Sequence, residues 1–328
     1  MKVLVTGAGS LLMRGIAVAL AQRGDEVVCL QRREVSFTPT QNIRQVNGDI
    51  RDPVVLASAV IGCDAVIHGA ARVGVIGSWA EYHDVNVVGT RLILDAAQQA
   101  GAAKFVHVST PSVAHAGKSL VGETAQPAVT GRKGAYYAES KALAEVHALS
   151  ANSGSFGVVA LRPHLVWGPG DTQLVGRIVE RALAKKLVMV GSGTALVDST
   201  FIDNAVSAHI AALDALTPNA VCAGRAYVIA NGEPRTVREL VQGICVAAGV
   251  EFAPRRVPVS VARIVGSVVE KVWPKFRDGE PPITRFVAEQ LSTAHWFDPR
   301  PACDELNWTP HISLDQGFAL LRESFQSN

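Results

Sequence analysis

Residues 1–13 read MKVLVTGAGSLLM, and this stretch decides the fold class. The β-branched run Lys2–Thr6 predicts a buried strand, and the apolar periodicity of Leu12–Arg23 predicts a helix directly after it. Gly7 and Gly9 lie in the turn between them, where a side chain would keep a pyrophosphate away from the backbone N–H groups of the helix. The arrangement is typical of the first unit of a dinucleotide-binding domain.

The glycine pattern of this turn is incomplete. Ser10 lies where a spaced G-x-x-G-x-x-G would place its second glycine, and Met13 lies at the third. An ordinary strand-to-helix turn is therefore the alternative interpretation. The position of the turn at the first strand favours a cofactor site, which we expect to include the following residues: Gly7, Gly9, Ser10, Leu11 and Leu12.

Strands and helices alternate through the first half of the chain. Short apolar runs predict strands at Lys2–Thr6, Glu26–Leu30, Ile43–Asn47, Ala65–His68, Lys104–Ser109 and Gly157–Arg162. Helical periodicity fills Leu12–Arg23, Pro53–Val60, Tyr82–Ala100 and Tyr136–Ser153. Strands that are apolar on both faces and alternate with helices predict an α/β fold with a doubly wound parallel sheet of the Rossmann type.

The pattern changes after the turn Gly168-Pro169-Gly170. Residues 172–186 and 204–216 predict helices, 226–229 a strand, and the remainder mostly short helices. We therefore expect a dinucleotide-binding domain over 1–168, rejoined by about 201–230, and a smaller, mostly helical substrate cap over 169–328.

Composition excludes several classes of function. With 328 residues, 48% of them hydrophobic, the chain can bury a large core and is not disordered. The formal net charge is +2 without a long basic run, so we expect no nucleic-acid partner. Five scattered cysteines without a C-x-x-C pair predict neither a metal site nor a disulfide framework, and they fit a reducing cytoplasm. No targeting or membrane-spanning segment is visible, so we expect a cytoplasmic protein.

The end of the second predicted strand bears on cofactor choice. It reads Cys29-Leu30-Gln31-Arg32-Arg33, with no carboxylate to bind the ribose hydroxyls of NAD. Because guanidinium groups bind a 2′-phosphate, we expect NADP(H) to be preferred over NAD(H), although Arg32 and Arg33 could equally be solvated surface residues. Asp49, followed by Ile50, could accept from the adenine amino group or serve only as a helix N-cap.

Tyr137 and Lys141 are one turn apart on a predicted helix. A nearby cation lowers the pKa of a tyrosine, which would suit it to proton transfer, although a surface pair is the usual reason for this spacing. Ser109, Thr110 and Ser112 follow a predicted strand, at the edge where ligands bind in such sheets. A hydroxyl there could hold a substrate carbonyl, or could simply form the turn.

Together these features resemble the extended short-chain dehydrogenase/reductases. The motifs occur in order: the glycine turn, Asp49, Ala70-Ala71, Asn86-Val87-Val88-Gly89-Thr90, Ser109-Thr110, Tyr137-x-x-x-Lys141 and Arg162-Pro163. Within that family the chain looks most like the 3β-hydroxysteroid dehydrogenase-type branch, and particularly like bacterial 2-alkyl-3-oxoalkanoate reductases of long-chain olefin biosynthesis. The stretches that carry this narrower resemblance are Ser109–His115, Leu161–Asp171, Phe201–His209, Asn231–Pro234 and Gly279–Arg285.

The resemblance implies roles for individual residues. Tyr137 would be the acid/base, and Lys141 would tune it and bind the nicotinamide ribose. Thr110 would hold the substrate oxygen, with Ser109 as the alternative. Further cofactor contacts would come from Ile50, Ala70, Ala71, Asn86 and Pro163. Ser10 and Met13 depart from the family pattern and bear on how tightly the cofactor binds.

The expected function is NADPH-dependent reduction of a 3-oxo group on an apolar substrate, most plausibly a 2-alkyl-3-oxoalkanoate. A 3β-hydroxysteroid dehydrogenase and a non-catalytic NAD(P)-binding sensor are the alternatives, and a nucleotide-sugar epimerase is less favoured. The apolar stripe in Val257–Phe276 could be core, could line an acyl-chain pocket, or could meet a membrane or a partner enzyme. His164 could contact a substrate oxygen or simply pack. Relatives suggest a homodimer and association with enzymes of the same pathway.

Overall fold

Seven parallel strands form the main sheet of the computed structural model, which describes residues 1–37, 42–74, 77–114, 119–132, 134–276 and 285–327, without the side chains of 270–287. The strand order is β12-β7-β5-β4-β1-β2-β3. Their bounds are β1 Lys2–Thr6, β2 Glu26–Gln31, β3 Ile43–Asn47, β4 Ala65–His68, β5 Lys104–Val108, β7 Gly157–Pro163 and β12 Ala226–Ile229. All seven predicted strands are confirmed within a residue or two. The order reverses between β1 and β4, which is where such sheets bind ligands.

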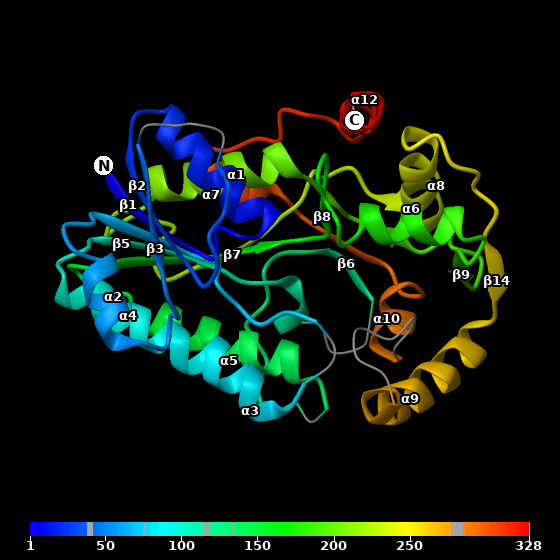
Figure 1. Cartoon of the computed structure of the whole chain (residues 1–328), viewed down its shortest axis with the longest axis horizontal. Coiled ribbons are helices and arrows are strands. Elements are labelled where there is room, and N and C mark those ends of the chain that lie inside the picture. Colours follow the sequence, from blue (N-terminus) through cyan, green and yellow to red (C-terminus); the bar gives the residue numbers. More distant parts are fainter. Residues whose placement is uncertain (38–41, 75–76, 115–118, 133, 277–284, 328) are drawn as a thin grey trace.

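Helices cover both faces of this sheet (Figure 1). One face carries α1 (Leu11–Gln22) and α7 (Ile202–Ala215), and the other carries α2 (Pro53–Ala59), α4 (Gly89–Gln99) and α5 (Tyr136–Ser150). Each face has its own apolar cluster, because successive strand residues point to opposite sides. The doubly wound α/β fold is therefore confirmed.

The helix predicted over 82–100 has three parts. It begins as α3 (Trp79–Tyr82), continues as a π-helical segment, His83–Val88, and ends as α4. π-Helical turns are rare and occur often at functional sites. Here the wider turn carries Asn86, which is buried against α5.

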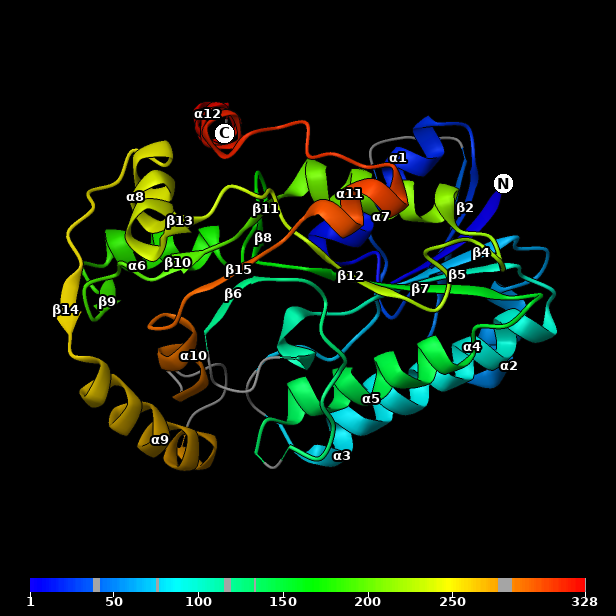
Figure 2. The same cartoon turned by 180° about the vertical axis from the view of Figure 1, so that it is seen from behind.

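The cap is built from helices and very short strands (Figure 2). Around an apolar cluster lie α6 (Val175–Leu183), α8 (Val237–Ala247) and α12 (Leu314–Gln326). A four-stranded sheet contains β13 (Arg235–Thr236), β10 (Leu196–Val197), β15 (His295–Phe297) and β6 (Leu120–Glu123). Two further pairs are β8 (Val166–Trp167) with β11 (Thr200–Phe201), and β9 (Val188–Val190) with β14 (Arg255–Val257). Most of these cap strands are two or three residues long, which is too short for strand periodicity to show.

One part of the expected cap packs elsewhere. The helix α11 (Arg300–Leu306) lies against α7 and β12, and Ala302, Leu306 and Trp308 join the apolar cluster beside the main sheet. These buried side chains thus belong to the core beside the main sheet, although their residues fall within the range 169–328 that the sequence assigns to the cap.

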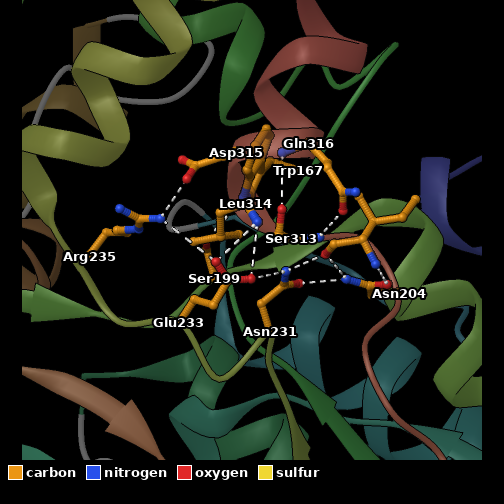
Figure 3. Close-up of polar contacts among 11 residues, drawn as sticks. Trp167, Ser199, Asn204, Asn231, Glu233, Arg235, Ser313, Leu314, Asp315 and Gln316 are labelled. Carbon is orange, nitrogen blue, oxygen red and sulfur yellow. Dashed lines mark hydrogen bonds and ion pairs between the residues drawn. The ribbon is translucent and has the colours of Figure 1, made fainter.

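Two buried asparagines, Asn204 in α7 and Asn231 just after β12, bind the segment that leads into α12 (Figure 3). Asn204 accepts from the N–H groups of His311 and Ile312 and donates to the Ile312 carbonyl and to Asn231. Asn231 also donates to the Ile312 carbonyl, at 2.8 Å. Glu233 then accepts from the Leu314 N–H. The stretches 201–209 and 231–234, singled out from the sequence, thus hold the start of α12.

The long helix α9 (Val259–Phe276) exposes much of its predicted apolar stripe. Val261, Ile264, Val265 and Val268 are 43–66% exposed, so this part of the stripe is not core. Val272 and Trp273 have no described side chains, and His115 and residues 279–284 lie outside the described residues. Within the described ranges, no helix is both long enough and apolar enough to cross a membrane.

Candidate active site and cofactor groove

A cavity of about 540 Å³ lies at the carboxyl ends of β1, β2 and β4. Eight of the expected cofactor residues line it: Gly7, Gly9, Ser10, Arg32, Asp49, Ile50, Ala70 and Ala71. Arg33, considered with Arg32 for the 2′-phosphate, lines it too, as do residues that the sequence did not single out for the cofactor, among them Gly69 and Arg72. The side chains of Leu11 and Leu12 instead pack in apolar clusters, so only their backbone could face a cofactor.

Gly7 is the glycine that the turn requires. Its φ is +81°, and a Cβ there would lie 2.8 Å from the Ala70 backbone. A Cβ on Gly9 would meet nothing closer than the Val35 side chain at 3.8 Å. Gly9 therefore borders open space in the cavity that it lines. Ser10 caps α1 by accepting from the Met13 N–H. At the position where the spaced motif has its second glycine, this chain therefore has a serine that caps the helix.

Met13 does not obstruct the groove. Its side chain is 1% exposed and does not line the cavity. It packs instead over Gly69, where a Cβ would lie 2.3 Å from the Met13 sulfur. A glycine at the end of β4 therefore makes room for a methionine at the position where the family pattern has a glycine.

The part of the cavity beyond the end of β2 carries cationic groups. Arg32 and Arg33 are exposed and line it. Asp49 is ion-paired with Arg51 at 2.7 Å, and this contact, rather than the more distant Arg32, is the main cause of its lowered pKa. Asp52, not Asp49, is the N-cap of α2, so the simple capping interpretation of Asp49 is wrong. The groove, with its glycine cradle and these arginines, fits a dinucleotide.

Thr110 and Tyr137 meet beyond the carboxyl end of β5, the strand next to β4, and neither of them lines the groove. Thr110 follows β5 and accepts from the Ser112 N–H, while Tyr137 lies in the first turn of α5. Burial raises the pKa of Tyr137 to about 12, and hydrogen bonding to Thr110 acts in the opposite direction. The expected lowering of this pKa is therefore wrong, because burial outweighs the other influences and Lys141 is not among them.

Lys141 is buried and bonded to the backbone. Its ammonium donates to the Val108 carbonyl oxygen at 2.7 Å. Burial lowers its pKa to about 8, and the Glu145 carboxylate partly opposes that shift.

The Ser109 hydroxyl hydrogen-bonds to a buried carboxylate. Its hydroxyl donates to Glu145 at 2.6 Å, and Glu145 forms a buried ion pair with Arg162. Sequence reasoning missed Glu145, although its spacing of four residues from Lys141 places both on one helix face. The Ser109 hydroxyl is therefore engaged in the core, whereas Thr110 adjoins Tyr137.

Asn86 links the groove to the helix that carries Tyr137. Its amide accepts from and donates to the Arg72 backbone, and it donates to Ser140 at 2.9 Å. Ser140 in turn donates to the Tyr137 carbonyl oxygen. Pro163 ends β7 and does not line the cavity. His164 hydrogen-bonds His295 and lies edge-on against Phe297, so it is packed.

The sheet, the groove at its switch point and the Thr110–Tyr137–Lys141 cluster define an NAD(P)-dependent dehydrogenase/reductase of the extended short-chain type. Residues 4–259 match the 3-beta hydroxysteroid dehydrogenase/isomerase family, and the chain belongs to that family.

Individual relatives and structures agree with this assignment. The chain is 42% identical to a 2-alkyl-3-oxoalkanoate reductase of Stenotrophomonas maltophilia, with 99% of each chain covered. It is 30% identical to a 3-beta-hydroxysteroid dehydrogenase of Mycolicibacterium neoaurum, covering 97% of this chain and 89% of the other. It also superposes on MoeE5 bound to UDP-glucuronic acid and NAD, with a TM-score of 0.73, 25% identity, and 100% and 99% of the two chains covered.

Proposed function

We propose that this enzyme reduces the 3-oxo group of a 2-alkyl-3-oxoalkanoate, using NADPH. The observation that carries the proposal is the convergence of the Thr110 and Tyr137 side chains at the carboxyl end of β5, the strand next to β4, whose own carboxyl end contributes to the groove. The similarity to a 2-alkyl-3-oxoalkanoate reductase over almost the whole chain supports the substrate class. Arg32 and Arg33 in the groove, where no acidic residue ends β2, support the phosphorylated cofactor.

When bound, the nicotinamide cofactor supplies the hydride. Thr110 holds the substrate carbonyl oxygen by donating a hydrogen bond, which polarises the carbonyl carbon. Tyr137 delivers a proton from its phenol to the same oxygen as negative charge develops there. The phenol carries its proton at neutral pH, as reduction requires, because the pKa of a tyrosine already lies well above 7 and burial raises this one further. Lys141 would hold the nicotinamide ribose, and Asn86 fixes the start of α5 through Ser140.

A turnover screen tests the substrate class. Purified enzyme is mixed with NADPH or NADH and with a 2-alkyl-3-oxo acid, a 3-oxosteroid or a nucleotide sugar. We expect turnover of the first substrate and faster turnover with NADPH. Preferential turnover of the steroid would favour the second candidate, a 3β-hydroxysteroid dehydrogenase, which the similarity to such enzymes supports.

Tyr137→Phe separates an enzyme from a dinucleotide-binding sensor. It removes the proton donor and keeps the ring, so we expect NADPH binding to be retained and turnover to be nearly abolished. Normal turnover by this variant would reject the mechanism. The same proposal includes a cytoplasmic location, a homodimer and association with enzymes of the same pathway, which gel filtration and co-purification would test.

A further inference from the structure

The turn that carries Thr110 is held from outside by an arginine. After Thr110 the chain makes a single 3-10 turn, Pro111–Val113, and short turns of this kind are weakly stabilised by their own hydrogen bonds. Arg132 donates to the carbonyl oxygens of Ser112 and Val113, at 2.8 and 2.9 Å. The planar guanidinium thus bridges two successive carbonyls at the end of the turn.

The link to the Thr110 hydroxyl is short. Ser112, whose carbonyl accepts from Arg132, donates its own N–H to the Thr110 hydroxyl oxygen at 3.3 Å. The Thr110 hydroxyl also reaches the Ser112 hydroxyl at the same distance. Any displacement of the Ser112 peptide would therefore move the partners that fix the Thr110 side chain.

The backbone of Arg132 is itself fixed to the helix that carries Tyr137. The carboxylate of Glu139, two residues after Tyr137 and 8% exposed, accepts from the N–H groups of Gly131 and Arg132 at 2.8 and 2.7 Å. Glu139 is thus engaged by backbone groups, and no ion pair to a carboxylate is found for Arg132 in the described part of the chain. Burial lowers the pKa of Arg132, and the nearby Glu139 charge partly opposes that lowering.

We propose that Arg132 is a positioning residue that sets the Thr110 hydroxyl against the Tyr137 phenol. Glu139 fixes the Arg132 backbone to α5. The guanidinium of the same residue binds the turn after β5, so the position of that turn relative to α5 is fixed through Arg132. Arg132 is half-buried and, among the described residues, forms no ion pair with a carboxylate. Its guanidinium instead binds the Ser112 and Val113 carbonyls, and this contact accounts for its burial. The inference rests on the proposed reductase function.

The kinetic test uses Arg132→Ala and Arg132→Lys, with Arg225→Ala as a control for removal of an arginine, because Arg225 pairs with Glu305 on the surface. We expect Arg132→Ala to lower kcat by about 10- to 100-fold, somewhat less than loss of an oxyanion donor, with the KM for substrate changed little. Arg132→Lys keeps the charge but has its donors on a single nitrogen, so its kcat should lie between the two, and added guanidinium should restore part of the activity of Arg132→Ala. Arg225→Ala should behave as wild type.

A double-mutant cycle shows whether Arg132 acts through Thr110. In a Thr110→Ala background the residue to be positioned is gone, so Arg132→Ala should add little further loss. If the losses in kcat from Thr110→Ala and Arg132→Ala instead multiply in the double variant, the proposal is overturned. An unchanged kcat in Arg132→Ala alone would also overturn it. A higher KM for the acid but not for its methyl ester, at unchanged kcat, would make Arg132 a substrate carboxylate contact and would also overturn it.

Hydrogen exchange tests the clamp without any substrate. Peptide amides over 110–113 should exchange faster in Arg132→Ala than in wild type or Arg225→Ala, since the two carbonyl contacts are lost. Equal exchange would reject the clamp. If wild type reduces none of the screened substrates, the proposed function fails and the exchange result still decides on the clamp.

Discussion

The Lys141 ammonium donates to the carbonyl oxygen of Val108 at 2.7 Å and is not among the groups that shift the pKa of Tyr137. The ammonium is therefore held by the strand that leads to Thr110. Burial places the pKa of Lys141 at about 8, against an ordinary value of 10.5.

This burial predicts a pH dependence of stability. Between these two pKa values the unfolded chain binds more protons than the folded one, so the free energy of unfolding rises with pH through that window. The rise is about 1.4 kcal/mol for each unit by which the folded pKa lies below the unfolded one. Lys141→Met should lack it, as urea unfolding at pH 7–10.5 would show. Buried thiols such as Cys29, whose pKa is raised to about 12, act oppositely in both proteins and cancel in the difference.

Ser109 and Thr110 should respond differently to loss of their hydroxyls. Thr110→Ala removes the proposed donor to the substrate oxygen, so we expect kcat to fall by about 100-fold. Thr110→Ser keeps a hydroxyl donor and should retain most of the wild-type kcat. Ser109→Ala loses its bond to the buried Glu145, which should cost about 1–3 kcal/mol of stability and much less activity. Steady-state kinetics and thermal unfolding of the three variants check this. The reverse ranking would assign the substrate contact to Ser109.

Met13 and Gly69 should be energetically coupled. Gly69→Ala places a Cβ 2.3 Å from the Met13 sulfur, so the variant should lose about 1–3 kcal/mol through overpacking. Met13→Ala should relieve that clash, so the double variant should be more stable than the sum of the two single losses predicts. Gly154→Ala is the control, because nothing lies within 4 Å of its added Cβ. Additive losses in denaturant titrations would mean that the packing is not shared.

Arg32 should discriminate between the two cofactors. Arg32→Ala should weaken NADPH binding by about tenfold, the loss of one charge-assisted hydrogen bond, and should leave NADH binding nearly unchanged. Arg44→Ala provides a control, since Arg44 is exposed on β3 but does not line the groove. Fluorescence titrations with both cofactors give the comparison. Equal weakening of both would remove the argument for a 2′-phosphate site.

Much of the fold follows from local sequence. The alternation of apolar strands with periodic helices predicts the parallel sheet, because each strand must be covered on both faces. The same logic fails for the small cap sheet and for the packing of α11 on the first core. Two-residue strands such as β10 and β13 exist only because segments far apart in the chain meet there.

By itself, the sequence determined the chemistry available: a phenol and an ammonium one helical turn apart, hydroxyls after β5, and arginines where an acid would favour NAD. Only the tertiary structure decided how these groups behave. Burial raises the pKa of Tyr137 to about 12, the Lys141 ammonium donates to a carbonyl of β5, and Glu145 accepts from Ser109. A pKa or a hydrogen bond depends on solvent exposure and on neighbours brought from distant segments, and spacing along the chain encodes neither.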